Sequence, residues 1–224
     1  ASAAYVENIA DGVARIYGDN RYETAFAVAD AIKQNAGVEK FDSVVVAYGR
    51  EFADALAGSY LSAIKRAPIL LCWNRGGKFE YLNQNILDYI DENLTADGTV
   101  YILGGTAAVP KTMADALEGV NVQRLAGDNR YETNLKILEA AGVEGDEILV
   151  ATGMDFADCL AASATGLPIL MVNSRLNNLT SGQKEFLEAN SGKNITVIGG
   201  EAAVSKALLE KLEDYCYVER IQGA

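Results

Sequence analysis

One segment of the chain occurs twice, almost unchanged. The sequence RIYGDNRYET at 15–24 returns as RLAGDNRYET at 124–133, with eight of ten positions identical and 109 residues between the two starts. A match of this quality indicates a tandem duplication. The fold must therefore be one that each copy, of roughly 100 residues, can form beside the other.

Three further motifs recur in the same order. FADAL at 52–56 matches FADCL at 156–160, PILL at 68–71 matches PILM at 168–171, and GGTAAV at 104–109 matches GGEAAV at 199–204. The sequence RIQG at 220–223 echoes the start of both copies. The matches divide the chain into a lead-in at 1–14, a first repeat at 15–123, a second repeat at 124–219, and the start of a third repeat or a swapped strand at 220–224.

Strand and helix patterns alternate within each copy. Apolar runs such as 43–48 and 99–103 are typical of strands buried on both faces, and the pattern at 22–35 predicts an amphipathic helix with Ala25, Val28, Ala29 and Ile32 on one face. This order predicts an α/β fold made of tandem Rossmann-like three-layer α/β/α repeats with mainly parallel sheets. We expect about four strands per repeat plus the Arg-x-x-Gly strand, which would complete a neighbouring repeat's sheet.

The duplicated segment contains a helix-start signal. Asn20 followed by Glu23, like Asn129 followed by Glu132, predicts a capping box in which the Glu side chain reaches back to the amide of the cap residue. Gly18 and Gly127 fall where a strand turns into this helix, a place that often needs positive φ.

Each copy also carries two arginines that a helix cap does not need. They are Arg15 and Arg21 in the first copy and Arg124 and Arg130 in the second. The structural interpretation is that they form ion pairs with Asp19 or Asp128, or lie at a repeat interface. The alternative is that they bind a ligand.

Other candidate binding residues fall at the carboxyl ends of the strands, where open parallel sheets bind ligands. Asp54 and Asp158 are either helix caps, favoured by the helix dipole, or hydroxyl acceptors for a sugar. Gly104-Gly105 and Gly199-Gly200 are either tight turns or a source of amides for a phosphate or carboxylate. No GxGxxG or P-loop pattern accompanies these glycines, so neither dinucleotide nor P-loop binding is supported.

A further pair of arginines recurs after the apolar strand motif. Arg75 and Arg175 each lie seven residues past the proline that opens it. They are either solvated loop charges or ligand contacts.

Composition excludes several classes of function. The net charge of −12 argues against nucleic acid and anionic membranes as general partners. The absence of histidine removes Ser-His-Asp and Cys-His catalysis and histidine metal ligation, and we predict no metal or cofactor.

Cys72, Cys159 and Cys216 are expected to be buried free thiols. No apolar window is long enough to span a bilayer. No secretory leader is recognisable, and ASAA at 1–4 fits a processed or an artificial end.

Taken together, the motifs resemble the cell wall-binding repeat family (type 2) of surface proteins of Gram-positive bacteria, notably clostridia. The resemblance covers nearly all of 15–224, in both copies and in order. It implies an extracellular protein at the cell wall, with three tandem repeats in a pseudo-threefold trimer, that binds an anionic secondary wall polymer without a covalent bond. It also links ligand binding to the apolar motif, here Ile69-Leu70-Leu71 and Ile169-Leu170-Met171. The residues themselves predict buried strands there, with ligand contacts just past them.

This chain departs from the family pattern, because it has two repeats and the start of a third and is strongly acidic. Binding an anionic polymer would then need a local basic pocket, for example of Arg21, Arg75, Arg130 or Arg175, or a bridging divalent cation. The leading hypothesis is a non-catalytic module that anchors a surface protein to an anionic wall polysaccharide or teichoic-acid-like polymer. The alternatives are a structural surface-layer subunit that associates through its repeats and, less favoured, a sugar-phosphate or nucleotide enzyme.

Overall fold

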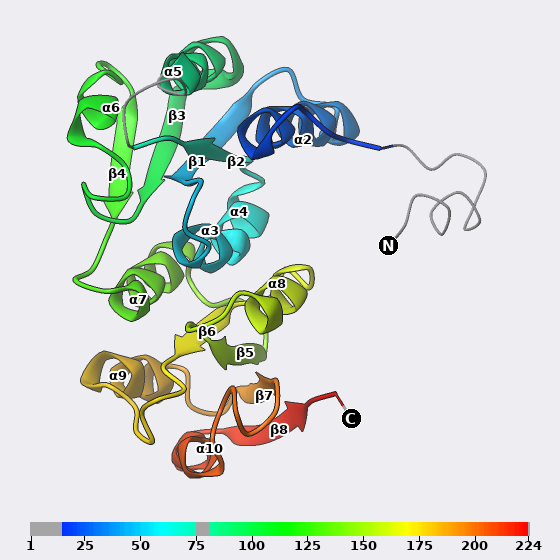
Figure 1. Ribbon diagram of the computed structural model, residues 1–224, viewed down its shortest axis with the longest axis vertical. Coiled ribbons are helices and arrows are strands. Elements are labelled where there is room, and N and C mark those ends of the chain that lie inside the picture. Colours follow the sequence, from blue (N-terminus) through cyan, green and yellow to red (C-terminus); the bar gives the residue numbers. More distant parts are fainter. Residues whose placement is uncertain (1–14, 75–80, 224) are drawn as a thin grey trace.

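Two four-stranded sheets, each interleaved with helices, form the computed structural model, which describes residues 15–74 and 81–223 (Figure 1). The elements of the first unit are α2 (Arg21–Ala36), β1 (Phe41–Tyr48), α3 (Ala53–Ala57), α4 (Ser59–Lys65), β2 (Ile69–Cys72), α5 (Tyr81–Asn93), β3 (Leu94–Leu103), α6 (Lys111–Asp115) and β4 (Asn121–Leu125). The elements of the second are α7 (Arg130–Ala141), β5 (Glu147–Thr152), α8 (Ala157–Ser163), β6 (Ile169–Val172), α9 (Ser181–Ala189), β7 (Asn194–Ile198), α10 (Lys206–Glu213) and β8 (Tyr217–Ile221).

Both sheets have the same strand order and are parallel throughout. The orders are β2-β1-β3-β4 and β6-β5-β7-β8. This confirms the tandem Rossmann-like α/β fold. The expected strand number was one too high, because each copy holds only three helix-linked apolar runs before the Arg-x-x-Gly strand.

The Arg-x-x-Gly strand belongs to the sheet that precedes it in the chain. Arg124 of β4 pairs in register with Ile102 of β3, and Arg220 of β8 pairs with Val197 of β7. The expectation that this strand completes a neighbouring repeat's sheet is therefore correct. The first sheet extends to Leu125, just past the point where the second sequence copy begins.

Alternating side chains of β1 face two different apolar layers. Val44 and Val46 lie in a cluster with residues of α2, α5 and α6, whereas Val45 and Ala47 lie in a second cluster with residues of α3, α4 and α7. All four side chains are fully buried. Burial on both faces explains why β1 is apolar at nearly every position, as in parallel sheets covered by helices.

Helix α7 joins the two repeats through a shared core. It lies between the two sheets (Figure 1), where it packs on α3 and α4 of the first repeat and on β6 of its own. Ile137 and Leu138 are fully buried there, in a cluster that runs from Val45 of the first sheet to the core of the second. The relative position of the repeats is therefore set by core packing.

Helix α2 corresponds to α7 in the sequence but is less covered. Of the four residues expected on one face, only Ala29 is fully buried, and Val28 is 40% exposed. Ala25 and Ile32 are half-buried. The predicted helix is confirmed, and its apolar face is only partly buried because no described element packs on α2 as α3 and α4 pack on α7.

Both helix starts are capped, with one change from the expected pattern. The Asn20 side chain accepts hydrogen bonds from the amides of Tyr22 and Glu23, at 2.9 and 3.1 Å. The Glu23 carboxylate accepts from the Asp19 amide, at 3.0 Å, rather than from the amide of the cap residue itself. The same bonds recur around Asn129 in the second repeat.

Gly18 and Gly127 are needed for space and not for positive φ. Neither is among the described glycines with positive φ. A Cβ atom at Gly18 would lie 2.4 Å from the Cβ of Glu23, and one at Gly127 would lie 2.3 Å from the Cβ of Glu132. The strand thus enters the helix by passing directly against its first turn.

We predict that equivalent positions of α7 and α2 differ sharply in their contribution to stability. Ile137→Ala should lower the free energy of unfolding by about 2–4 kcal/mol because it leaves a cavity in the shared core. Val28→Ala should cost less than about 1 kcal/mol, since Val28 is partly exposed. Urea unfolding of both variants measures the difference, and equal losses would contradict the shared-core description.

Candidate functional site

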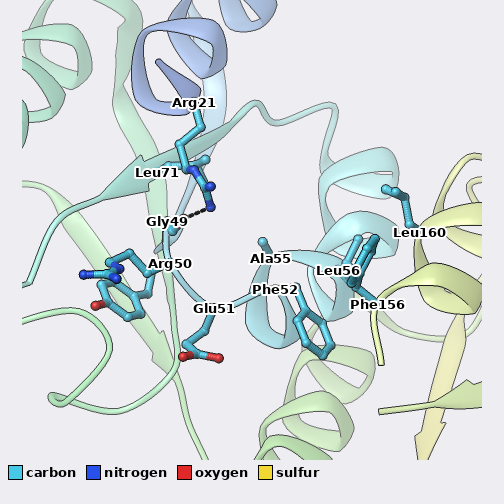
Figure 2. A pocket seen from close by; sticks show the side chains of 11 residues that line it. Arg21, Gly49, Arg50, Glu51, Phe52, Ala55, Leu56, Leu71, Phe156 and Leu160 are labelled. Atoms are coloured by element: carbon cyan, nitrogen blue, oxygen red, sulfur yellow. Dashed lines mark hydrogen bonds between the residues drawn. The ribbon is translucent and has the colours of Figure 1, made fainter. Parts of the chain in front are cut away.

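A cleft of about 530 Å³ opens between the two repeats, at the carboxyl end of β1. Its lining comes from the ends of β1 and β2, the start of α2, the loop between β1 and α3, α3 itself, and the start of α8 in the second repeat. Figure 2 shows Arg21 and Arg50 on one side of the cleft and Phe156 and Leu160 on the other. The cleft therefore exists only when both repeats are in place.

The apolar wall of the cleft comes from matching positions of the two copies. The rings of Phe52 and Phe156 lie 6.1 Å apart between centroids, tilted by 60°. Leu56 and Leu160 follow one helical turn later in each copy and also line the cleft. Phe156 and Leu160 are 52% and 53% exposed, so the second repeat contributes an open apolar surface.

Arg21 and Arg130 are held by backbone carbonyl groups. Arg21 donates from Nη1 to the Gly49 carbonyl at 2.9 Å, and Arg130 donates to the Gly153 carbonyl at 2.7 Å. The expected ion pairs with Asp19 and Asp128 do not form. Across 15–74 and 81–223 the only ion pairs are Lys111–Asp115 and Lys211–Asp214. The expected place at a repeat interface holds for Arg130, whose guanidinium lies 5.3 Å from the Phe52 ring centroid.

The arginines of the edge strands make the same kind of bond. Arg124 donates to the Gly104 carbonyl at 2.9 Å, and Arg220 donates to the Gly199 carbonyl at 2.8 Å. Arg15, the third member of this series, is exposed, and no hydrogen bond of its side chain occurs within the described residues. Arg124 and Arg220 therefore tie each edge strand to the end of the strand beside it. Arg15 lies beside no sheet in the described structure.

Asp54 and Asp158 lie in the first turns of α3 and α8, but neither caps its helix. Each carboxylate instead lies against a glycine turn: a Cβ atom at Gly104 would be 2.3 Å from Oδ2 of Asp54, and one at Gly199 would be 2.4 Å from Oδ2 of Asp158. Burial raises the pKa of Asp54, and the nearby charge of Arg130 opposes that rise. The helix-cap interpretation was wrong. The two carboxylates pack against the glycine turns and do not cap the amides at the start of their own helices.

The glycine pairs form tight turns at the ends of β3 and β7. Gly104 and Gly199 have φ of +89° and +105°, and their amides donate to the carbonyls of Leu125 and Ile221 at 2.8 and 2.9 Å. These amides therefore serve the sheet and cannot also hold an anion. The carbonyl of Gly105 accepts bonds from the next turn of chain, as does that of Gly200.

The remaining candidate positions lie apart from the cleft or outside the described structure. Arg75 lies outside the described residues, and Arg175 is exposed in the loop after β6, where its amide donates to the Asn173 side chain at 3.0 Å. In the apolar motifs, Leu70 and Leu170 are fully buried, which confirms the predicted strands. Leu71 is half-buried and lines the cleft, although contacts were expected only past the motif.

Both repeats match one known family. Residues 15–114 and 124–209 match Cell wall binding domain 2 (CWB2). The chain belongs to this family. The match follows the duplicated motifs, so the two copies are two members of the same domain type.

This chain spans less than two-fifths of the length of the relatives and solved structures that it matches. The N-acetylmuramoyl-L-alanine amidase LytC of Bacillus subtilis (strain 168) is 27% identical over 208 residues, which are 90% of this chain and 39% of that protein. The amidase enhancer of the same organism is 26% identical over 211 residues, or 92% and 27%. Among solved structures, Cwp8 from Clostridium difficile superposes with a TM-score of 0.78 at 29% identity, covering 93% of this chain and 35% of Cwp8. Cwp6 from the same organism, at 24% identity and a TM-score of 0.76, shares the fold.

Of the residues that line the cleft, only Arg21 was among the predicted site residues, and Arg50 and its neighbour Trp73 are among those missed. Arg50 lines the cleft, and its guanidinium lies 5.6 Å from the centroid of the Trp73 ring. Neither is duplicated, since Met154 and Asn173 stand at the matching positions of the second copy. A search for repeated residues overlooks such positions, and only a comparison of differences between the copies would have found them.

The cysteines and acidic side chains of the described residues form neither a disulfide nor a metal-binding cluster. All three cysteines are free and buried, as expected, and burial raises the pKa of the Cys72 and Cys159 thiols to about 12. Over 15–74 and 81–223, no group of three or more Cys, Asp or Glu side chains is placed to hold a metal ion. No described helix is both long and apolar enough to cross a membrane.

We predict that the two glycines of the first turn respond very differently to substitution. Gly104→Ala should lower the free energy of unfolding by about 2–4 kcal/mol, because positive φ is strained for alanine and the new Cβ meets the Asp54 carboxylate. Gly105→Ala should change it by less than about 1 kcal/mol, because the added Cβ meets nothing within 4 Å. Thermal unfolding of both variants tests this, and a tolerated Gly104→Ala would refute the described turn.

Proposed function

We propose that the chain is a non-catalytic module that holds a bacterial surface protein at the cell wall by binding an anionic wall polymer without a covalent bond. Its membership of the CWB2 family supports wall binding. One relative is named an amidase, but this chain spans only 39% of its length. The module would therefore supply attachment and leave any chemistry to other parts of such proteins.

The observation that carries this proposal is the cleft between the repeats. Its apolar wall of Phe52 and Phe156 suits the carbon face of a sugar ring. Its edge carries Arg21 and Arg50, which make no ion pair among the described residues. Unpaired guanidinium groups are suited to phosphate or carboxylate groups. A chain of net charge −12 would thus meet an anionic polymer through a local basic edge.

The residues that motivated an enzyme hypothesis have structural partners. Asp54 and Asp158 pack on the glycine turns, and the first glycine of each turn, Gly104 or Gly199, bonds the edge strand through both its amide and its carbonyl. Because these groups are engaged in structural contacts in both copies, the structure favours attachment to a ligand over catalysis.

We predict that the full chain co-sediments with isolated Gram-positive cell walls and that extraction of their secondary anionic polymers abolishes the binding. Quantifying the protein in pellet and supernatant gives the result. Equal binding to extracted walls would contradict a polymer ligand, and no binding to either would contradict the proposal.

A second candidate function is self-association, and unpartnered surfaces at both ends of the structure favour it. Ile16 and Tyr17 are 47% and 68% exposed, whereas Leu125, which matches Ile16, is 5% exposed in the first sheet. The amide of Gly18 donates to Thr24 Oγ1 at 3.0 Å, as that of Gly127 does to Thr133 Oγ1. Residues 15–18 are thus fixed to their helix as the end of β4 is to α7, but they have no sheet to join among the described residues.

The opposite surface lies on the second repeat. Phe156 and Leu160 on α8 match residues that α7 approaches in the first repeat. We propose that 15–18 and α2 of one copy dock on α8 of another, with 15–18 pairing as a strand in the place of β8. Strand β8 is suited to exchange because Tyr217 and Ile221 at its ends are mostly exposed. Such head-to-tail contacts build open assemblies.

We predict that two single-face variants complement each other. Val28→Asp should block the α2 surface and Leu160→Asp the α8 surface, so each variant alone should be monomeric while an equal mixture forms a dimer. The unchanged chain should form longer species as its concentration rises. Light scattering after size separation measures all four samples. A monomeric unchanged chain at high concentration would rule out self-association.

A further inference from the structure

The two copies differ most informatively at the edge of the cleft. Arg50 follows Gly49 at the end of β1, and Met154 follows Gly153 at the matching place. Trp73 follows β2, and Asn173 follows β6. The scaffold around these positions is the same in both copies, down to the arginine bond to each glycine carbonyl. The difference therefore concerns the side chains presented at the surface.

Contacts around Trp73 hold Arg50 in place. The Arg50 guanidinium lies 5.6 Å from the centroid of the Trp73 ring, a cation–π contact. Tyr22 meets the same ring edge-on, with centroids 6.0 Å apart and planes at 81°. The Asn83 side chain bonds both the amide and the carbonyl of Trp73, at 2.9 and 2.7 Å. The tryptophan is thus a fixed support for an exposed arginine.

Arg21 brings a second charge to the same edge. Its Nη1 is bonded to the Gly49 carbonyl, directly before Arg50. Burial raises the pKa of Tyr22, and the nearby charges of Arg21 and Arg50 both oppose that rise. Glu51 also lines the cleft, but neither arginine lies within 4.0 Å of a carboxylate in the described residues. Two positive charges against one negative charge leave this edge basic.

We propose that Arg50 and Arg21 bind a phosphate or carboxylate substituent of a saccharide polymer, and that the tandem pair has one such subsite, on the first repeat. This rests on the proposed wall-binding function and names the part of the cleft that recognises charge. A guanidinium that stacks on an aromatic face keeps its N–H groups in the plane free for an anion. The sugar ring attached to that anion would lie against Phe52 and Phe156.

The test uses the full chain and compares Arg50→Ala with two matched controls. Arg175→Ala removes an exposed arginine from the second repeat, and Met154→Ala alters the position that matches Arg50. Wall co-sedimentation gives the affinity for the native polymer, and calorimetry with short poly(glycerol phosphate) or oligogalacturonate probes separates phosphate from carboxylate. Urea unfolding confirms that each variant keeps its stability.

Arg50→Ala should weaken binding to walls and to one of the probes by at least about tenfold, which corresponds to about 1.4 kcal/mol. Arg175→Ala and Met154→Ala should stay within about twofold of the unchanged chain. The double substitution Met154→Arg with Asn173→Trp should add a second bound probe per chain. If Arg50→Ala and Arg175→Ala weaken binding equally, the loss reflects the overall charge of the chain, and the subsite is overturned.

Failure of the subsite and failure of the proposed function give different results. If the unchanged chain binds walls and Arg50→Ala binds them equally well, the subsite is wrong and wall attachment stands. If neither probe binds the unchanged chain, the assignment of a phosphate or carboxylate group is overturned. If the unchanged chain does not bind walls, the proposed function itself fails.

Discussion

Burial of one helix between two sheets is the interaction on which the rest of this structure depends. Helix α7 begins the second repeat, yet its apolar residues Ile137 and Leu138 pack in a cluster that includes Leu61 and Val45 of the first. Burying such side chains contributes roughly 1.5–3 kcal/mol each. This packing fixes how the repeats face each other, and it brings Phe156 to Phe52. The cleft is therefore a consequence of core packing, although none of its exposed residues belongs to that core.

A second constraint on the structure is a hydrogen bond from an arginine to a glycine carbonyl, which occurs four times. Arg21, Arg124, Arg130 and Arg220 each donate to the carbonyl of a glycine at a strand end. Charge-assisted bonds of this kind are stronger than neutral ones, and a half-buried carbonyl at a turn needs a donor. The duplicated arginines are thus primarily architectural. Recognition of a charged ligand then falls to residues outside the duplicated set, or to the donor groups that these arginines keep free.

How far the sequence predicts this structure depends on the range of the interaction. The alternation of strands and helices and the edge strand that joins the preceding sheet follow from local patterns and from the repeat, and they are correct, although each sheet has one strand fewer than expected. The partners of the arginines could not be predicted, because a backbone carbonyl carries no sequence signal. The glycine that precedes each capped helix was found, but its reason was missed, since close approach of Glu23 to Gly18 depends on the path of the strand. Arg50 and Trp73 were missed because neither recurs at the matching position of the second copy.

Duplication itself explains why the differences between copies carry functional information. After duplication, residues that hold the scaffold remain under the same packing constraints in both copies, as the matched bonds of Asn20 and Asn129 show. Surface positions beside the cleft are free of those constraints and can diverge. In this acidic chain, the positive charge of Arg50 on its aromatic support opposes the overall field, and that field weakens long-range attraction of an anion while leaving short-range bonds intact. Binding would then be selective for ligands that reach the arginine edge and the apolar wall together, which a polymer with alternating charged groups and sugar faces can do.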